Sequence, residues 1–380
     1  MFIATSTGQG ITHTVTTDTL KEIACFISPH GFGHATRTIA ILEALQKRIS
    51  RLHPHIFTTV PQSLFSETLD HFTYHPVQTD IGLEQKSAME IDIDATAINL
   101  GNLIPFSDSL ITKLASLCST CSVILCDIAP LGVAVAREVG IPSILVENFT
   151  WDWIYKPHPE LIFFAEQLQQ EFNRATYRIQ TEPLCQHKPH SLLCGPIFRN
   201  FRKDKKTVQK ELGAASRKVV VITTGGINQE LPIWDEMSRM SDFFFVILGQ
   251  QQGGKVGENI LLLERQTPFY HPDLINCADL VICKAGYSTI AECFQAGVRI
   301  MTIGREDFAE SKILIDFIQK HMSGISIRQS DFFSGEWLQR ISEVLTLPQV
   351  SPAGENGADR VASWMIDLHK ILSKTTHQHR

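Results

Sequence analysis

The stretch SPHGFGHATR, residues 28–37, lies where an expected strand gives way to an expected helix. Residues 23–28 form a short apolar run, and residues 36–49 repeat apolar side chains at helical spacing. Short β-branched runs alternate with such helical patterns along most of the chain, which is typical of parallel βαβ units. The sequence therefore predicts an α/β fold built on doubly wound sheets.

Two groups of expected strands divide the chain. The first group comprises residues 23–28, 55–60, 74–79, 123–127 and 143–147, and the second comprises 218–224, 243–248, 259–263, 280–283 and 299–303. A Gly-Pro pair and a basic run between the groups mark a junction. We expect a frayed tail at 1–20 and two Rossmann-like halves, 21–196 and 197–350, that face each other across a cleft. A helix within 351–373 is expected to pack back, by preference on the first half.

The composition is that of an ordinary globular protein, since 43% of the 380 residues are hydrophobic and 19% are charged. A net charge of −6 argues against nucleic acids or anionic membranes as general partners, although peripheral membrane contact is left open. Nine cysteines, an odd number, predict reduced thiols and a cytoplasmic location. We expect no signal peptide and no membrane span, because no segment has the required apolar length.

The loop in the opening stretch has the composition of an anion-binding turn. Gly31 and Gly33 allow a tight turn that leaves main-chain amides at a helix start. His34 and Arg37 share one helical face, where a neutral histidine can act as a general base and an arginine can hold a phosphate or carboxylate. A plain strand–turn–helix, whose histidine satisfies main-chain groups, is the structural alternative.

The segment LVICKAGYSTIAECFQAG, residues 280–297, repeats this arrangement of strand, glycine turn and helix in the second half. Thr289 and Glu292 have the spacing of a capping box, in which Glu292 satisfies only its own helix. The functional alternative places a diphosphate at Gly286, Ser288 and Thr289, and ribose hydroxyls at Glu292. The local residues leave both interpretations open.

Two further loops are expected at the same cleft. REDFAES, residues 305–311, follows the last strand of the second group. TTGGIN, residues 223–228, follows the first strand of that group, and its Gly225 and Gly226 suit a close approach of the main chain to a phosphate. We therefore include both loops in the candidate donor site.

Four motifs in this order resemble the double-Rossmann glycosyltransferases of the GT-B fold. The resemblance is greatest to the N-terminal, glycosyltransferase-like region of L-arabinokinases and its bacterial relatives. The motifs are HGFGHATR at 30–37, NFTWDWIY at 148–155, K-x-G-Y-x-T-x-x-E at 284–292 and R-x-x-F-x-E at 305–310. They lie within residues 23–320, which is most of the chain.

The resemblance implies that the second half holds a nucleotide-sugar donor, with uridine as the default base, and that the first half builds the acceptor site. The implied donor-binding residues are Gly225, Gly226, Lys284, Gly286, Tyr287, Ser288, Thr289, Glu292, Arg305 and Glu310. Among them, Glu292 would meet the ribose, and Glu310 the donor sugar or ribose. His34 is the implied base, and the acceptor side also contains His30, Gly31, Gly33, Arg37, Asp127 and Trp151.

Two departures limit what the resemblance implies. Ser288 stands where the arabinokinase-like group usually has glycine, which leaves the phosphate geometry open. No glycine- and serine-rich ATP loop follows residue 324, so we do not expect arabinose phosphorylation. The pattern G-x-G-H-x-x-R at 31–37 also resembles the UDP-sugar hydrolase of pseudaminic acid synthesis, in which a histidine activates water.

Several motif-like stretches favour structural explanations. GQQQGGKV, residues 249–256, lacks the Ser or Thr that a P-loop uses for magnesium and is expected to lead into a strand. Asp92 and Asp94 have D-x-D spacing, but we expect them in a solvated loop. The cysteines and histidines Cys118, Cys121, Cys185, His187, His190 and Cys194 fit no zinc module, so no metal site is expected. The aromatic residues around Trp151 suit either a core anchor or a wall on which a sugar stacks.

We therefore predict a metal-independent, inverting glycosyltransferase of the GT-B fold that needs no cofactor besides its nucleotide-sugar co-substrate, by preference a UDP-sugar. His34 would take a proton from an unidentified acceptor hydroxyl, and the helix start at 286–289 would receive the leaving diphosphate. Hydrolysis of a nucleotide sugar at the same site is the first alternative. A non-catalytic nucleotide-sugar sensor is the second.

Overall fold

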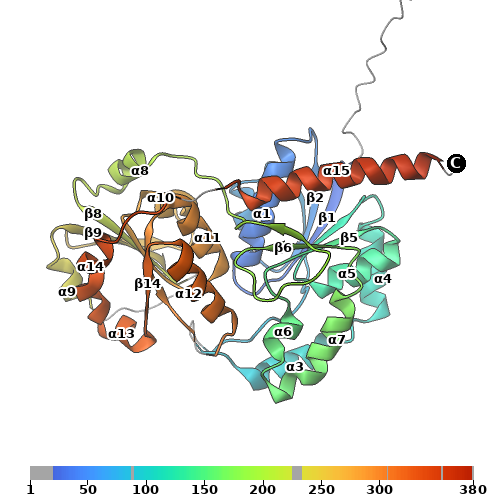
Figure 1. Ribbon diagram of the computed structural model, residues 1–380, viewed down its shortest axis with the longest axis horizontal. Coiled ribbons are helices and arrows are strands. Elements are labelled where there is room, and N and C mark those ends of the chain that lie inside the picture. Colours follow the sequence, from blue (N-terminus) through green and yellow to red (C-terminus); the bar gives the residue numbers. More distant parts are fainter. Residues whose placement is uncertain (1–19, 87–89, 225–232, 306, 352–353, 379–380) are drawn as a thin grey trace, which may run out of the picture.

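The computed structural model describes residues 20–86, 90–224, 233–305, 307–351 and 354–378. It contains two seven-stranded sheets, one in each half of the chain, with helices on both faces (Figure 1). Neighbouring strands run parallel, except at one edge of the second sheet, where the pair β10–β11 is antiparallel. The predicted α/β fold with two doubly wound halves is confirmed.

The first sheet has the strand order β3–β2–β1–β4–β5–β6–β7. Its strands are β1 (Glu22–Ile27), β2 (His53–Thr58), β3 (Thr73–Pro76), β4 (Ile124–Asp127), β5 (Ser143–Glu147), β6 (Tyr177–Thr181) and β7 (Leu192–Cys194). The direction of winding reverses between β1 and β4, where open α/β sheets have their ligand crevice. Ile27 at the end of β1 pairs with Asp127 at the end of β4, so the loop after β1 starts beside Asp127.

The helices of the first half are α1 (Gly33–Gln46), α2 (Gln62–Ser66), α3 (Ile93–Leu103), α4 (Asp108–Leu117), α5 (Pro130–Val139), α6 (Trp151–Tyr155), the 3₁₀-helix η1 (Pro159–Leu161) and α7 (Ile162–Phe172). Helix α1 starts three residues before the predicted position, since the amide of Thr36 already bonds to the carbonyl of Phe32 at 2.9 Å. Residues 34–42 of this helix are all buried, including His34 and Arg37. The opening stretch therefore reaches the interior of the molecule.

The second sheet has the order β10–β11–β9–β8–β12–β13–β14, and its winding reverses between β8 and β12. Its strands are β8 (Lys218–Thr223), β9 (Phe243–Gln250), β10 (Gly254–Val256), β11 (Ile260–Glu264), β12 (Leu280–Lys284), β13 (Arg299–Ile303) and β14 (Gly324–Ile327). Its helices are α8 (Lys205–Leu212), α9 (Trp234–Ser238), α10 (His271–Cys277), α11 (Tyr287–Ala296), α12 (Glu310–His321), α13 (Gln329–Ser334), the 3₁₀-helix η2 (Glu336–Arg340) and α14 (Ile341–Leu345). Residues 249–256, which partly resemble a P-loop, thus lie at the end of β9, in the turn that follows and in β10.

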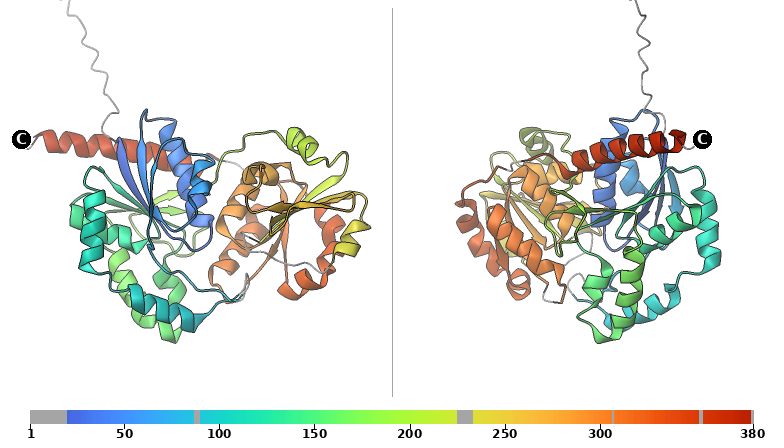
Figure 2. Two further views of the ribbon diagram at one scale, coloured as in Figure 1. Left: turned by 180° about the vertical axis from the view of Figure 1, so that it is seen from behind. Right: turned by 45° about the vertical axis from the view of Figure 1, so that its right-hand side comes forward.

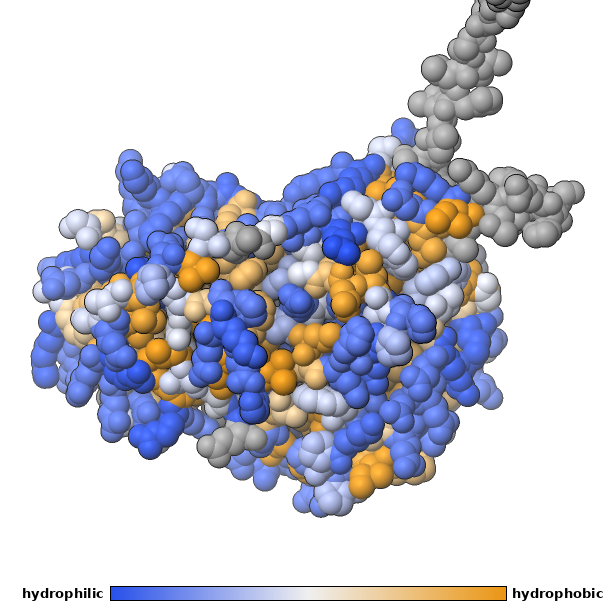
Figure 3. All heavy atoms as spheres, in the orientation of Figure 1, coloured by the Kyte–Doolittle hydropathy of each residue, from blue (hydrophilic) through white to orange (hydrophobic). Residues whose placement is uncertain are grey.

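Helix α15 (Gly357–Gln378) returns from the second half and lies along the first half beside α1, as both views in Figure 2 show. Val361 and Met365 join the apolar core under α1. The chain can return here because Gly357 has no side chain: a Cβ at this position would lie 2.3 Å from the carbonyl oxygen of Gly195. Hydrophilic residues cover most of the face seen in Figure 3, and hydrophobic residues form separate small patches on it.

Candidate active site

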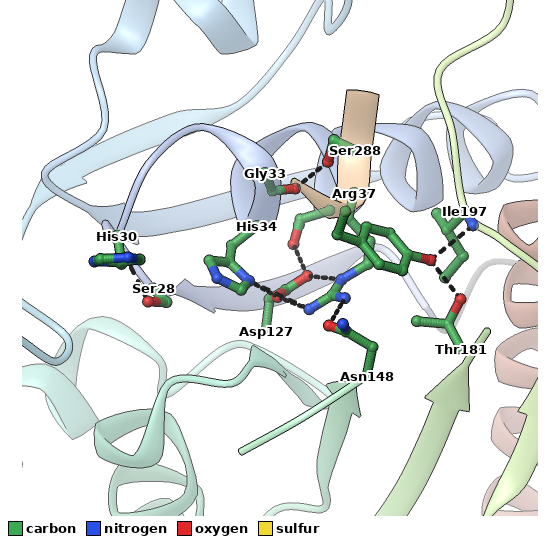
Figure 4. Close-up of polar contacts among 12 residues, drawn as sticks. Ser28, His30, Gly33, His34, Arg37, Asp127, Asn148, Thr181, Ile197 and Ser288 are labelled. Carbon is green, nitrogen blue, oxygen red and sulfur yellow. Dashed lines mark hydrogen bonds and ion pairs between the residues drawn. The ribbon is translucent and has the colours of Figure 1, made fainter. Parts of the chain in front are cut away.

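The start of α1 is the centre of the candidate site. Strand β1 ends at Ile27, and Gly31 turns the chain with a φ of +72°. A residue with a Cβ would be strained at this angle, so the glycine is needed for the turn. His34 and Arg37, near the start of α1, both point toward Asp127 (Figure 4).

His34 is held by Asp127, because its Nδ1 lies 3.0 Å from Asp127 Oδ1. Nη2 of Arg37 is also near, at 3.3 Å from His34 Nδ1, but the carboxylate is closer and accepts. We therefore assign the proton of the neutral imidazole to Nδ1, which leaves the lone pair of Nε2 for a substrate. The ring packs edge-on against Phe149, with the two centroids 5.9 Å apart.

Arg37 is the second partner of Asp127. Its guanidinium donates to both carboxylate oxygens, with Nε 2.9 Å from Oδ2, and also to Asn148 Oδ1 at 2.8 Å. Burial alone would raise the pKa of Asp127, but the charge of Arg37 and the hydrogen bonds from His34 and Arg37 hold it below its ordinary value. Asp127 is therefore ionised. The arginine that the sequence assigns to a substrate anion holds this carboxylate of the protein.

Asn148 links the two halves of the molecule. Its amide oxygen accepts from Arg37, and its amide nitrogen donates to Oε1 of Glu310 at 2.7 Å. Glu310 is the first residue of α12 and is buried; burial raises its pKa in spite of the Asn148 hydrogen bond and the charge of Arg305. A polar chain thus runs from His34 through Asp127, Arg37 and Asn148 to the second half.

His30 also lies in this region, where it packs among aromatic rings. Its ring stacks on Phe308 with centroids 6.1 Å apart and meets Trp151 edge-on at 5.1 Å. Burial, followed by the charges of nearby basic groups, lowers the pKa of His30 well below its ordinary value. Its Nδ1 accepts from the main-chain amide of Leu83 at 3.3 Å, which places the proton on Nε2. His30 is therefore suited to donate a hydrogen bond, whereas His34 is suited to accept a proton.

The network borders a cavity of about 320 Å³ between the two halves. We call it the His34 cavity. Its walls are aromatic and basic, and the lining includes His30, His34, Phe149, Arg265, Lys284, Arg305, Phe308 and Glu310. Trp151 is fully buried behind His30, so Phe149 and Phe308 provide the aromatic wall that the sequence assigns to Trp151. The volume is at the lower end of the range of small-molecule sites.

A second cavity, of about 220 Å³, adjoins the first, and we call it the α11 cavity. The two share the lining residues Gly31, Phe32, Gly33, Arg265, Lys284 and Tyr287. Gly286, Ser288, Thr289 and Glu292 line only the α11 cavity. Helix α11 begins after Gly286 without a side-chain cap, so its first main-chain amides suit an anionic ligand.

Glu292 is bound by two residues from outside its own helix. Its Oε1 accepts from Nε of Arg199 at 3.1 Å, and its Oε2 lies 2.8 Å from Nδ1 of His271. Burial opposes ionisation, but these two neighbours lower the pKa of Glu292, so the carboxyl is ionised. The capping-box prediction is wrong, because α11 begins before Thr289 and Glu292 binds Arg199 and His271 instead of its own main chain.

Tyr287 and Lys284 differ in what their polar atoms contact. The hydroxyl of Tyr287 accepts from the amide of Ile197 at 3.0 Å and lies 2.6 Å from Oγ1 of Thr181, so it fastens the junction between the halves. Lys284 makes no ion pair with any residue of the described ranges and lines both cavities. Gly225 and Gly226 lie outside the described residues.

The remaining sequence signals have structural roles. Asp92, predicted in a loop, caps α3 by accepting from the amide of Ala95 at 3.0 Å, and Asp94 lies in the first turn of that helix.

Within the described residues, no group of three or more His, Cys, Asp or Glu side chains is arranged to hold a metal ion. None of the described helices has the length and apolar character that crossing a bilayer would need.

The sequence analysis did not identify Asn148, Arg199 and His271 as members of the candidate site. Asn148 opens the motif NFTWDWIY, which was the available signal. Arg199 follows the Gly-Pro pair of the junction, but nothing in the local pattern connects it to Glu292. His271 carries no motif, and its role is visible only once α10 lies beside α11.

No protein-family model matches the chain. The chain is 25% identical over 358 residues to the L-arabinokinase of Arabidopsis thaliana, a match that covers 89% of this chain and 33% of the relative. The chain thus spans about a third of the length of that curated relative.

Solved glycosyltransferases share the architecture. The calicheamicin glycosyltransferase CalG4 superposes with a TM-score of 0.58 at 10% identity, covering 91% of this chain and 93% of that one. UGT2 of Phytolacca americana, complexed with UDP-2fluoro-glucose and pterostilbene, has a TM-score of 0.56 at 14% identity, covering 94% and 99%. The fold is therefore the GT-B fold that the sequence resemblance implied.

Proposed function

We propose that the protein is a glycosyltransferase that moves a sugar from a nucleoside-diphosphate donor, by preference a UDP-sugar, to an acceptor hydroxyl. The observation that carries this proposal is the 3.0 Å contact between His34 Nδ1 and Asp127 Oδ1, at the wall of a cavity that adjoins the start of α11. The two adjoining cavities thus offer a base in one and an anion-binding helix start in the other. This arrangement suits a displacement at a sugar carbon. The relative from Phytolacca americana, which binds UDP-2fluoro-glucose, supports the choice of donor.

The donor is assigned to the α11 cavity, with its diphosphate at the start of the helix. Gly286 and Thr289 line the cavity there, and Lys284 and Arg265 lie at its border with the His34 cavity. Main-chain amides, the helix dipole and these cations stabilise the negative charge that develops on the leaving diphosphate. The protein itself thus supplies the positive charge that the leaving group needs, and we infer a metal-independent reaction.

The acceptor is assigned to the His34 cavity. Its hydroxyl oxygen forms a bond to the anomeric carbon, while the bond from that carbon to the diphosphate oxygen breaks and the electron pair leaves with the nucleoside diphosphate. His34 Nε2 takes the hydroxyl proton, and the resulting imidazolium donates to the ionised Asp127. Because the acceptor attacks from the side opposite the leaving group, the configuration at the anomeric carbon inverts.

The test measures the release of nucleoside diphosphate from a panel of nucleotide sugars by the wild type and by His34→Ala. We expect loss of the base to lower turnover by a factor of about 10²–10⁴. Affinity for the nucleoside diphosphate should stay close to the wild-type value, because His34 does not line the α11 cavity. His71→Ala, at an exposed histidine, is the matched control and should keep full turnover.

The products distinguish the alternatives. Release of free sugar by the wild type, lost in His34→Ala, would identify hydrolysis with the same base. Nucleotide binding by a wild type that turns over no donor with any acceptor would identify a sensor and contradict the proposal. Equal turnover in the wild type and His34→Ala would exclude His34 as the base.

A further inference from the structure

Arg305 is a buried cation that pairs with no carboxylate among the residues that the structure describes. It is 7% exposed, and its Nε is buried without a hydrogen-bond acceptor. Its side chain makes no hydrogen bond and no ion pair within the part of the chain that the structure describes. The guanidinium lies over the ring of Phe308, with Cζ 4.0 Å from the centroid. Its main-chain amide donates to Ser311 Oγ at 3.2 Å, which fixes the residue just after β13.

Such a group destabilises the fold unless an anion pairs with it. A buried cation loses its hydration, and the contact with Phe308 compensates only part of that loss. Burial is the largest influence and lowers the pKa of Arg305, in spite of the attraction of Glu310 and Asp307. Neither carboxylate approaches the guanidinium to ion-pair distance. An unpaired charge in a cavity is a recognised mark of a ligand site.

The position of Arg305 separates it from the other cations. Lys284 and Arg265 line both cavities, whereas Arg305 lines the His34 cavity and is absent from the lining of the α11 cavity. A diphosphate at the start of α11 therefore has cations closer than Arg305. Arg37, in the same cavity, is already paired with Asp127. Among the cations that line only the His34 cavity, Arg305 is therefore the arginine without an ion pair in the described residues, which leaves it for the sugar or the acceptor.

We propose that the substrate group in the His34 cavity is acidic and that Arg305 binds its carboxylate or phosphate ester. A guanidinium whose Cζ lies over an aromatic ring keeps its N–H groups for hydrogen bonds, and their fork matches two oxygens of one anion. Glu310, which also lines the cavity, already accepts a hydrogen bond from Asn148, and burial raises its pKa.

Which substrate carries the anionic group is inferred from the proposed function, which allows the donor or the acceptor. The group belongs either to the donor, as the carboxylate of a uronic acid, or to the acceptor, as a carboxylate or phosphate ester. The donor arm of the test titrates the protein with UDP-glucuronate against UDP-glucose, and with UDP-galacturonate against UDP-galactose. The acceptor arm titrates the UDP-saturated protein with glucuronate and glucose 6-phosphate against glucose.

In either the donor or the acceptor arm, we expect the acidic compound to have an affinity at least about tenfold higher than that of its neutral counterpart. Arg305→Met should abolish that preference, and Arg305→Lys should keep part of it. UDP alone should bind the Met variant nearly as well as the wild type. Because methionine replaces an unpaired buried charge, Arg305→Met should not lower the Tm, which separates lost binding from misfolding.

Each other outcome is decisive. If UDP binds but neither arm shows a preference, or the preference survives in Arg305→Met, the proposal is wrong. A clear loss of Tm in Arg305→Met would assign the residue to the fold and overturn it as well. If UDP does not bind, the nucleotide function fails, and glucuronate and glucose 6-phosphate alone decide the anion site: binding that Arg305→Met abolishes supports it, and no binding overturns it.

Discussion

Ser288 Oγ donates a hydrogen bond of 2.8 Å to the main-chain oxygen of Gly33, so the first turns of α11 and α1 touch across the two halves (Figure 4). Oγ1 of Thr36 adds a hydrogen bond of 2.8 Å to the same hydroxyl. The serine that departs from the glycine of the arabinokinase-like pattern therefore fastens the two helix starts beside the α11 cavity. Both hydrogen bonds of its hydroxyl join the second half of the molecule to the first.

Ser288→Gly removes these two contacts. Each is expected to contribute about 0.5–1.5 kcal/mol, so the free energy of unfolding and the Tm should fall. Nucleotide affinity should hold or rise, because glycine allows the main chain to approach a phosphate more closely. Thermal unfolding and calorimetric titration check both effects. Ser116→Gly, at an exposed serine of α4, reports the cost of a helical glycine, and an equal loss there would contradict the role of Ser288.

Glu292→Gln tests the ribose assignment. The substitution removes the charge that pairs with Arg199 and lies beside His271 but keeps the size of the side chain. If Glu292 accepts from the ribose hydroxyls, affinity for UDP should fall about tenfold or more, and affinity for 2′,3′-dideoxy-UDP should change far less. Calorimetry on both nucleotides measures this. Equal weakening of the two would show that the variant acts by disturbing Arg199.

Lys284 makes donor binding depend on pH. Burial, followed by the charge of Arg305, lowers the pKa of Lys284 to about 8. The ammonium is therefore charged below this pH and neutral above it, while a bound diphosphate raises its pKa. UDP affinity should fall above pH 8 by at most about tenfold per pH unit. Titrations from pH 7 to pH 9.5 should show this slope in the wild type, and a slope that persists in Lys284→Met would contradict the assignment.

Asp80 makes stability depend on pH. It is 2% exposed, and burial raises its pKa to about 8, in spite of the hydrogen bond from Ser28. The folded protein thus keeps Asp80 protonated up to that pH, whereas the unfolded chain ionises it near its ordinary pKa of about 3.9. As the pH rises from about 4 to about 8, this group should lower the free energy of unfolding by about 1.4 kcal/mol per pH unit. Above pH 8 its contribution should stay constant.

Asp80→Asn removes this dependence. Relative to the wild type, its free energy of unfolding should increase between pH 6 and pH 8, which urea unfolding at the two pH values measures. Asp70→Asn, at an exposed aspartate, is the control and should show no such gain. A difference between Asp80→Asn and the wild type that is the same at both pH values would refute the raised pKa.

Strands with uninterrupted apolar side chains could be predicted from the sequence. β5 and β13 begin and end where the pattern placed them. β6 was missed because Arg178 and Gln180 interrupt its apolar run. In the structure both side chains donate to Glu147 Oε1 on the neighbouring strand, at 2.7 Å and 3.0 Å. The partner that makes these polar residues compatible with a buried strand is distant in sequence, so a local pattern does not reveal it.

The sequence could predict which residue types lie at the strand ends of the site, but not which of these side chains contact each other. His34 and Asp127 were both candidates, yet their contact joins residues 93 positions apart. The ion pair of Arg199 with Glu292 is equally long-range and changes the chemistry expected of the ribose site. Such pairing depends on how the two halves meet across the cleft, which composition and spacing do not contain.

We expect the two adjoining cavities to hold a nucleotide sugar, and ligand-induced thermal stabilisation tests this most directly. The protein is heated with UDP, GDP, TDP, CDP and ADP and their common sugars, in EDTA and again in Mg²⁺. A ligand at about 100 times its Kd adds about 2.7 kcal/mol to stability, which raises the Tm by several degrees. We predict this shift in EDTA for one nucleotide class, uridine first, and a smaller shift in Glu292→Gln. No shift with any nucleotide, or a shift that requires Mg²⁺, would contradict the account.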